Sequence, residues 1–226
     1  QHPSTPEALG IQQIDFSNAF NIISRRAILA QLEVHAQSLL PYFRWSYGEA
    51  SPLFLSSGEF VGTCERGVRQ GDPLGPLFFC LGLHPVLTQL ALEFPSHQVV
   101  AYMDDVSLLG PVEGMQEVFE RLALLAYQQC DLRINTKKSI RFDPRGVSCP
   151  VPECPDDPPV STQGVLCLGS PVGTPAFELL HNASIVSQFT AQLDIIQTLE
   201  SPLALPILRS CVNTRATYLT RTSPPT

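Results

Sequence analysis

Two adjacent carboxylates, Asp104 and Asp105, stand inside an apolar stretch, AYMDDVSLLG at 101–110. A charge placed beside a hydrophobic core is unfavourable unless a partner compensates it. The apolar runs on both sides predict two strands, at 98–103 and 106–109, with the two aspartates at the tight turn between them. The fold must therefore compensate two neighbouring negative charges at one hairpin tip.

A third carboxylate, Asp15, ends a short predicted strand at 11–16. If this strand lies beside the hairpin, the three carboxylates converge at one edge of a sheet, where they repel one another unless cations neutralise them. Mg²⁺ binds carboxylate oxygens together with substrate phosphates, and two such ions, about 3.5–4 Å apart, suit phosphoryl transfer. The residues alone leave two interpretations open: a two-metal nucleotidyl-transfer site, or ordinary turn and capping chemistry.

The remaining pattern mixes helices and strands. Ser24 suits a helix N-cap, and Asp72-Pro73 suits the start of an apolar helix that we expect to kink near Pro85. The predicted elements are helices at 25–40, 74–94 and 115–126, strand pairs at 52–63 and 132–142, an exposed loop at 144–163, a strand and turn at 165–173, and C-terminal helices broken by Pro202 and Pro206. Without strict strand–helix alternation, we predict an α+β fold, an antiparallel sheet with helices packed on one face.

Composition limits the class of protein. The 226 residues suit one large domain or two small ones. The net charge of −7 weakens the case for nucleic-acid binding without excluding it, because a local patch matters more than the total. Seven scattered cysteines indicate reduced, intracellular thiols, and Cys149 and Cys154 have no second ligand pair for zinc. No apolar run of about 18 residues appears, so no membrane span is expected.

Five sequence blocks resemble motifs A to E of reverse transcriptases, in the same order. They are IDFSNAFN (14–21), RGVRQGDPLGPLFF (66–79), YMDD (102–105), LRINTKKS (132–139) and CLGSPVG (167–173). The Arg-Gln-Gly-Asp-Pro-Leu form of the second block resembles non-LTR retrotransposons. One short motif is weak, but five in order favour the polymerase interpretation over the turn interpretation. The resemblance implies a polymerase palm over 1–175 and a helical, thumb-like start with an unstructured tail over 176–226.

The resemblance also implies a role for each matching residue. Asp15, Asp104 and Asp105 would hold two Mg²⁺ ions, or Mn²⁺ in their place, with the Phe16 backbone carbonyl as a further ligand. Lys138 would donate a proton to departing pyrophosphate, although a surface lysine without a role has the same appearance. These four side chains are the predicted catalytic set.

Other matching residues would contact substrates. Phe20 lies at the family's sugar-facing position, where its ring would exclude a ribose 2′-hydroxyl; a core phenylalanine is the alternative. Gln70, Gly71 and Tyr102 would meet the incoming nucleotide, although 70–71 could serve only to shape the helix start. The predicted nucleic-acid contacts are Arg69, which could equally be a solvated arginine, and the primer-gripping backbone of Leu168 and Gly169.

The resemblance therefore implies an RNA-directed DNA polymerase that uses an RNA template, a DNA primer and dNTPs. A palm that only binds and a template-copying RNA polymerase are the alternatives. Only 14 residues precede Asp15, none of them Lys or Arg, so most of the family's fingers region is missing. We expect a fragment of a longer polyprotein or a decayed element, with poor or absent polymerase activity.

Overall fold

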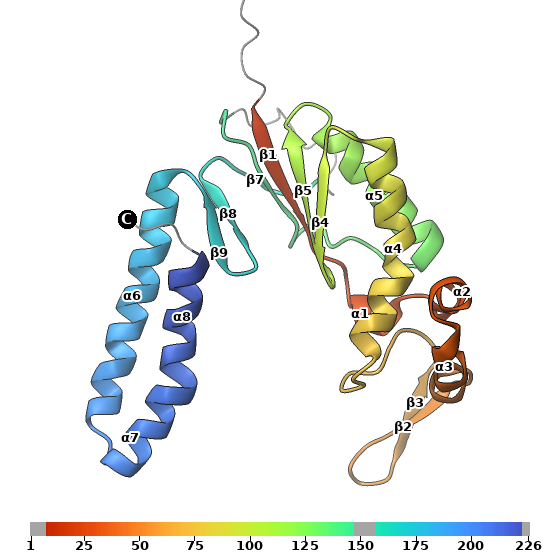
Figure 1. Cartoon of the computed structure of the whole chain (residues 1–226), viewed down its shortest axis with the longest axis horizontal. Helices are drawn as coiled ribbons and strands as arrows, with labels where there is room; N and C mark the ends of the chain where they lie inside the picture. The colour runs from red at the N-terminus through yellow and green to blue at the C-terminus, as the bar shows by residue number, and fades with distance from the viewer. Residues whose placement is uncertain (1–7, 147–156, 223–226) are drawn as a thin grey trace, which may run out of the picture. The chain divides into compact units, whose positions relative to one another are not determined.

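The structure is a computed structural model that describes residues 8–146 and 157–222. The chain divides into two compact units (Figure 1). The first comprises Gln1–Arg141 with Val151–Pro159, and the second comprises Phe142–Pro150 with Val160–Thr226. The predicted division at residue 175 into palm and thumb-like parts is a functional one and stays a prediction.

An antiparallel sheet forms the centre of the first unit. Its strands lie in the order β4 (Gln98–Tyr102), β5 (Asp105–Pro111), β1 (Leu9–Ile14) and β6 (Ile140–Phe142). The predicted hairpin is therefore confirmed, with one correction to its turn. Tyr102 pairs with Asp105, so Asp105 begins β5 and the two-residue turn is Met103–Asp104. Met103 has φ 56°, and a positive φ at the first turn residue matches the twist of a tight hairpin.

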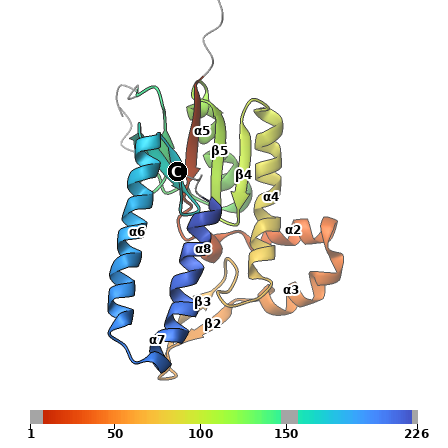
Figure 2. The ribbon, with the colours of Figure 1, turned by 60° about the vertical axis from the view of Figure 1, so that its left-hand side comes forward.

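Helices α4 (Gly75–Glu93) and α5 (Met115–Cys130) pack against this sheet and against each other (Figure 2). The predicted apolar face of α5 is fully confirmed, since the buried residues include Met115, Val118, Phe119, Leu122, Leu125 and Ala126. Helix α4 runs without interruption through Pro85. Its length and composition would also suit a membrane span, but Phe78 and Phe79 are completely buried in the core of the unit, as in a soluble core helix.

Shorter elements complete the first unit: α1 (Ala19–Ile22), α2 (Arg25–His35), a 3-10 turn at Gln37–Leu39, α3 (Leu40–Tyr47) and the hairpin β2 (Ser51–Phe54) and β3 (Phe60–Cys64). The predicted Ser24 cap is confirmed, because the Ala27 N–H donates to its hydroxyl. The helix predicted over 25–40 instead ends at His35. Ala36 leaves the helical region (φ −150°, ψ 57°), and Pro41 lies in the first turn of the next helix.

The strand predicted to begin at 132 also proves shorter. Only Ile134 forms a bridge, to Phe16, before β6 begins at Ile140. The bridge is closed by the Ser17 N–H, which donates to the Arg133 carbonyl, and by the Asn135 N–H, which donates to the Asp15 carbonyl. A turn from 135 to 139 occupies the space between the bridge and β6.

The second unit contains β7 (Val160–Ser161), the hairpin β8 (Gly164–Cys167) and β9 (Ser170–Gly173), and helices α6 (Pro175–Gln197), α7 (Ser201–Ile207) and α8 (Asn213–Thr222). Strand β8 and the turn after it confirm the strand and turn predicted at 165–173, and β9 adds a second strand. The predicted break at Pro206 is wrong, because α7 contains Pro206, continues to Ile207 and is followed by a π-helical turn, Leu208–Val212. Half of the predicted loop at 144–163, with Cys149 and Cys154, lies outside the described residues, as does the end of the tail.

Candidate active site

Strand register places two predicted carboxylates side by side. Ile14 pairs with Val106 on the antiparallel strands β1 and β5. Asp15 directly follows Ile14, and Asp105 directly precedes Val106, so both lie at the same end of neighbouring strands. Asp104 occupies the adjoining turn. Burial, and then the charges of Asp104 and Asp15, raise the pKa of Asp105 above its usual value.

This arrangement fits a cation without forming a closed cage. Across residues 8–146 and 157–222, no three His, Cys, Asp or Glu side chains come together as a ready metal site. Mg²⁺ does not require one, because it commonly uses one or two protein carboxylates and completes its shell with water and phosphate oxygens. The pKa of Asp105 is raised first by burial and then by the charges of Asp104 and Asp15, which a bound cation would offset. The donor set therefore suits a divalent cation that arrives with a phosphate ligand.

The backbone around Phe16 is compatible with its predicted part. The bridge to Ile134 uses the carbonyls of Arg133 and Asp15, so the Phe16 carbonyl is not one of the bridging acceptors. The Phe16 side chain is buried in the core. Lys138 is exposed, and its backbone N–H donates to the Asn135 carbonyl at 3.1 Å. The roles of both residues stay predictions.

The predicted nucleotide loop is a tight turn before α4. Gln70 and Gly71 are exposed, and the Asp72 N–H donates to the Arg69 carbonyl at 3.3 Å. Gly71 has φ 90° at the third position of this turn, where a positive φ favours glycine. The Asp72 carboxylate accepts the Leu74 N–H at 2.9 Å, so it caps the turn before the helix, which begins at Gly75.

Two tyrosines hold Asp72 in place. Tyr47 donates its hydroxyl hydrogen to one carboxylate oxygen, and Tyr42 donates to the other at 3.1 Å. Burial would raise the pKa of Asp72, but the hydrogen bonds from Tyr47, the Leu74 N–H and Tyr42 hold it below its usual value. Asp72 is thus a satisfied structural carboxylate.

Arginines brace the other side of the same loop. Arg25 donates to the Gly67 carbonyl at 3.0 Å and to the Cys64 carbonyl at 3.2 Å. Arg69 donates to the Ser46 carbonyl at 2.6 Å, and its guanidinium lies over the Tyr47 ring at 5.4 Å. Its predicted template contact stays a prediction, and a phosphate would have to share this group with Ser46.

Sequence reasoning missed several of these supports. Gly67 has φ 66°, and a Cβ there would lie 2.3 Å from the Phe20 carbonyl oxygen, so only glycine fits. Three further residues support the site although the sequence did not predict a role for them: Arg25, Tyr47 and Ser139. No spacing pattern marks Tyr47 or Arg25, because their partners lie 25 and 42 positions away in the chain.

The remaining candidates occupy varied places. Phe20 is half-buried and stacks on Phe79 with ring centroids 4.5 Å apart, so it has core contacts, and its effect on sugar choice stays a prediction. Tyr102 is 60% exposed beside Asp105. In the second unit, Leu168 and Gly169 form the β8–β9 turn with φ 50° and 81°, and Tyr218 donates to the Leu168 carbonyl.

A cleft of about 1250 Å³ opens beside the nucleotide loop. Its lining includes Asn21, Trp45, Arg66 and Gln70. The Trp45 side chain is 83% exposed. The cleft thus offers a concave surface, with an aromatic ring and arginines, next to the predicted nucleotide contacts.

A family-wide sequence comparison decides the relationship. The sequence model of "Reverse transcriptase (RNA-dependent DNA polymerase)" matches residues 2–164, more than half of the chain. The chain belongs to the reverse transcriptase family. Among curated proteins, this reverse transcriptase chain is 38% identical over 117 residues to the retrotransposable element SLACS 132 kDa protein of Trypanosoma brucei gambiense. The match covers 48% of the chain and 10% of that relative's length.

Solved structures agree with the family at the level of fold. Apo telomerase from Candida tropicalis matches with a TM-score of 0.54 and 11% identity, over 77% of this chain and 32% of that one. Telomerase from Candida albicans, in complex with a fragment of telomeric RNA, matches with a TM-score of 0.50 and 14% identity, over 76% and 31%. The α+β palm-like fold predicted from the sequence is therefore confirmed.

Proposed function

We propose that this chain is the palm-bearing part of a non-LTR retrotransposon's RNA-directed DNA polymerase, which adds dNTPs to a primer 3′-hydroxyl on an RNA template. The observation that carries the proposal is the side-by-side placement of Asp15 and Asp105 on β1 and β5, in a chain of the reverse transcriptase family. The chain spans only a tenth of its curated relative, so activity, substrates and partners belong to the proposal.

In this proposal the three carboxylates, with the Phe16 carbonyl, hold two Mg²⁺ ions. When bound, such ions favour the ionised primer hydroxyl and offset charge on the departing pyrophosphate. Lys138 donates a proton to the pyrophosphate oxygen as it leaves. Asp104 lies in the hairpin turn and Asp105 begins β5. Pairing of β5 with β1 fixes the position of both carboxylates relative to Asp15.

The substrate contacts follow from the exposed loop. Gln70 and Gly71 meet the template base and the nascent pair, because the glycine has no side chain to block a close approach. Phe20 excludes a ribose 2′-hydroxyl, and Tyr102 borders the nucleotide beside Asp105. Leu168 and Gly169 offer backbone groups to the primer strand, and Arg69 offers a cation to the template.

Primer extension tests the proposal. The chain is incubated with an RNA template, a DNA primer, dNTPs and MgCl₂, alongside Asp104→Asn and the control Glu117→Gln, which removes an exposed carboxylate on α5. Because most of the fingers region is missing, we expect weak extension by the wild type and the control, and none by Asp104→Asn. Extension that survives Asp104→Asn would overturn the proposed site.

A palm that binds nucleic acid without catalysis is the competing function, and the net charge of −7 favours weak binding. It predicts salt-sensitive RNA binding with no dNTP incorporation, whereas robust incorporation would remove it. An RNA polymerase would instead incorporate rNTPs in place of dNTPs. Comparing the two substrates in the wild type and in Phe20→Ala separates these outcomes.

A further inference from the structure

The backbone of Asp15 is held on both sides by one loop. The Asp15 N–H donates to the Ser139 hydroxyl oxygen at 3.1 Å. The Ser139 hydroxyl donates in turn to the Asn135 carbonyl at 2.9 Å. The Asn135 N–H donates to the Asp15 carbonyl at 2.7 Å. These three hydrogen bonds close a ring around the residue that bears the first predicted metal-binding carboxylate.

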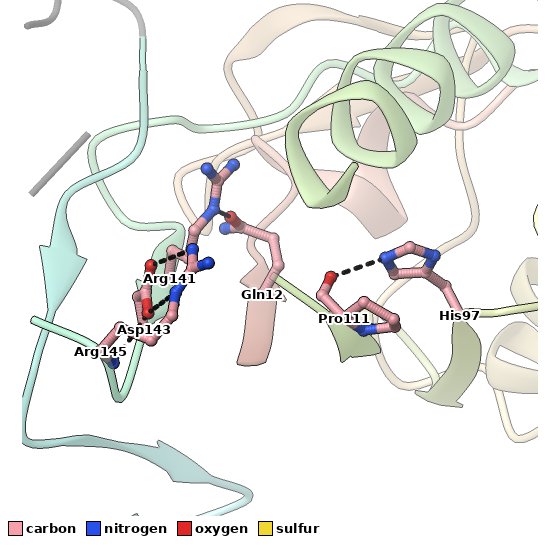
Figure 3. A network of polar contacts seen from close by, with 6 residues as sticks. All are labelled: Gln12, His97, Pro111, Arg141, Asp143 and Arg145. Carbon is pink, nitrogen blue, oxygen red and sulfur yellow. Dashed lines mark hydrogen bonds and ion pairs between the residues drawn. The ribbon is translucent and has the colours of Figure 1, made fainter. Parts of the chain in front are cut away.

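The sheet fixes the position of the Ser139 side chain. Its exposed fraction is 1%, so solvent does not compete for its hydroxyl. It directly precedes β6, and β6 is tied to β1 by Arg141, whose Nε donates to the Gln12 side-chain oxygen at 2.8 Å (Figure 3). Gln12 is completely buried. Docking of β6 on β1 therefore sets Ser139 beside Asp15, although 124 positions separate them in the chain.

The same loop carries Lys138. The Lys138 N–H donates to the Asn135 carbonyl at 3.1 Å, and the Ser139 N–H donates to the same acceptor at 2.9 Å. The Asn135 carbonyl thus accepts backbone hydrogen bonds from both Lys138 and Ser139, and the Ser139 hydroxyl connects this turn to the Asp15 N–H. Loss of the Ser139 hydroxyl would leave the partly buried Asp15 N–H without its acceptor, which is unfavourable.

We propose that Ser139 is a positioning residue that locks Asp15 and the Lys138 loop into one unit. It acts through Asp15, whose carboxylate direction depends on a fixed backbone. The part of this inference that concerns metal binding rests on the proposed function, and the part that concerns the backbone does not. Groups that orient a metal ligand commonly change metal affinity about 10–100-fold when removed.

Amide hydrogen exchange tests the backbone part directly. The full chain is compared as wild type, Ser139→Ala, Ser139→Thr and Ser24→Ala, by NMR of the Asp15 amide. Ser24→Ala is a matched control, because it also removes a serine hydroxyl that accepts a backbone N–H in the same unit. We expect slow exchange at Asp15 in the wild type and the control, exchange at least about tenfold faster in Ser139→Ala, and recovery in Ser139→Thr. Fast exchange in the wild type, or equally slow exchange in Ser139→Ala, would overturn the inference.

Mn²⁺ binding tests the positioning role. Electron paramagnetic resonance of free Mn²⁺ gives the apparent dissociation constant of each variant in the absence of nucleic acid. We expect roughly tenfold weaker binding in Ser139→Ala, recovery in Ser139→Thr, and no change in Ser24→Ala. Equal binding in Ser139→Ala and the wild type would reduce Ser139 to a stabilising residue only. Absence of Mn²⁺ binding in the wild type would instead count against the proposed metal site, while the exchange result would stand by itself.

Discussion

The Cys80 thiol on α4 lies close enough to Asp104 for the carboxylate charge to oppose thiolate formation. Burial, and then the charge of Asp104, raise the pKa of Cys80, while the Met103 backbone acts in the opposite direction. The helix that follows the nucleotide loop therefore touches the turn that carries the acidic pair. Cys80 can report on the charge of that turn without any substrate.

We predict that Asp104→Asn speeds alkylation of Cys80 by iodoacetamide. Removing the negative charge lowers the pKa of the thiol and increases the reactive thiolate, so the rate near pH 8 should rise about two- to fivefold. Mass spectrometry of the peptide that contains Cys80 measures the rate. Glu117→Gln should leave it unchanged, and an unchanged rate in Asp104→Asn would mean that the two groups are not neighbours.

Tyr47→Phe should destabilise the first unit by about 1.5–3 kcal/mol, because it removes a hydrogen bond to a charged carboxylate. Urea unfolding followed by circular dichroism measures the loss. Tyr42→Phe provides the comparison and should cost less, since its 3.1 Å bond leaves Asp72 with Tyr47 and the Leu74 N–H. Equal stability of Tyr47→Phe and the wild type would show that Asp72 does not depend on Tyr47.

Tyr47→Phe should also change how the free energy of unfolding depends on pH in the alkaline range. Burial, and then the hydrogen bond to Asp72, raise the pKa of Tyr47 from 10.0 to about 12. Folding therefore favours the neutral phenol over the phenolate. Its contribution to the free energy of unfolding is complete below pH 10 and is lost as the pH rises towards 12. Unfolding curves from pH 9 to 12 should fall more steeply for the wild type than for Tyr47→Phe. Parallel curves would contradict this assignment.

Asp105→Asn should raise the melting temperature at pH 7. The pKa of Asp105 is raised in the folded state, mainly by burial and then by Asp104 and Asp15. The charged form therefore costs stability above the folded pKa, and this cost disappears as the pH falls below the ordinary value of 3.8. Thermal scans at pH 7 and pH 3 should show the gain at pH 7 only. A loss of stability at pH 7 would mean that other contacts of the carboxylate dominate.

Leu168→Asn should stabilise the β8–β9 hairpin by roughly 1 kcal/mol, because asparagine tolerates the left-handed conformation better than leucine. Leu168 has φ 50° and is 54% exposed, so little burial is lost. Thermal denaturation measures the gain. Leu166 is an exposed leucine within β8, so Leu166→Asn is the control and should give no gain in stability. A gain in Leu166→Asn, or no gain in Leu168→Asn, would show that the left-handed backbone at Leu168 is not strained.

The sequence predicts the parts of this fold that local patterning controls. The α5 stripe from Met115 to Ala126 is apolar on one helical face, and the Ser24 cap sits directly before its helix; both are confirmed. The end of α2 at His35 was not predicted, because Leu39 and Leu40 continue an apolar pattern that the structure divides between two helices. The turn was misplaced by one residue, because Asp105 suits a turn as well as a strand start.

The sequence predicts the motif residues of the candidate site but not the contacts that support them. The carboxylates and the nucleotide loop follow from motifs that are continuous in sequence. Their supports depend on contacts between distant segments, such as Ser139 with Asp15 or Tyr47 with Asp72. A buried hydroxyl or phenol has no periodic signature, so only the folded chain identifies its partner.

Iron-directed cleavage tests the central claim, that Asp15 and the Asp104–Asp105 pair share one cation site. Fe²⁺ replaces Mg²⁺ on the chain, and ascorbate with peroxide generates hydroxyl radicals that cut the backbone nearest the metal. We expect cuts near residue 15 and near residues 104–105 together, both suppressed by excess Mg²⁺ and by Asp104→Asn. Cuts at only one of these positions, or a pattern indifferent to Mg²⁺, would contradict it.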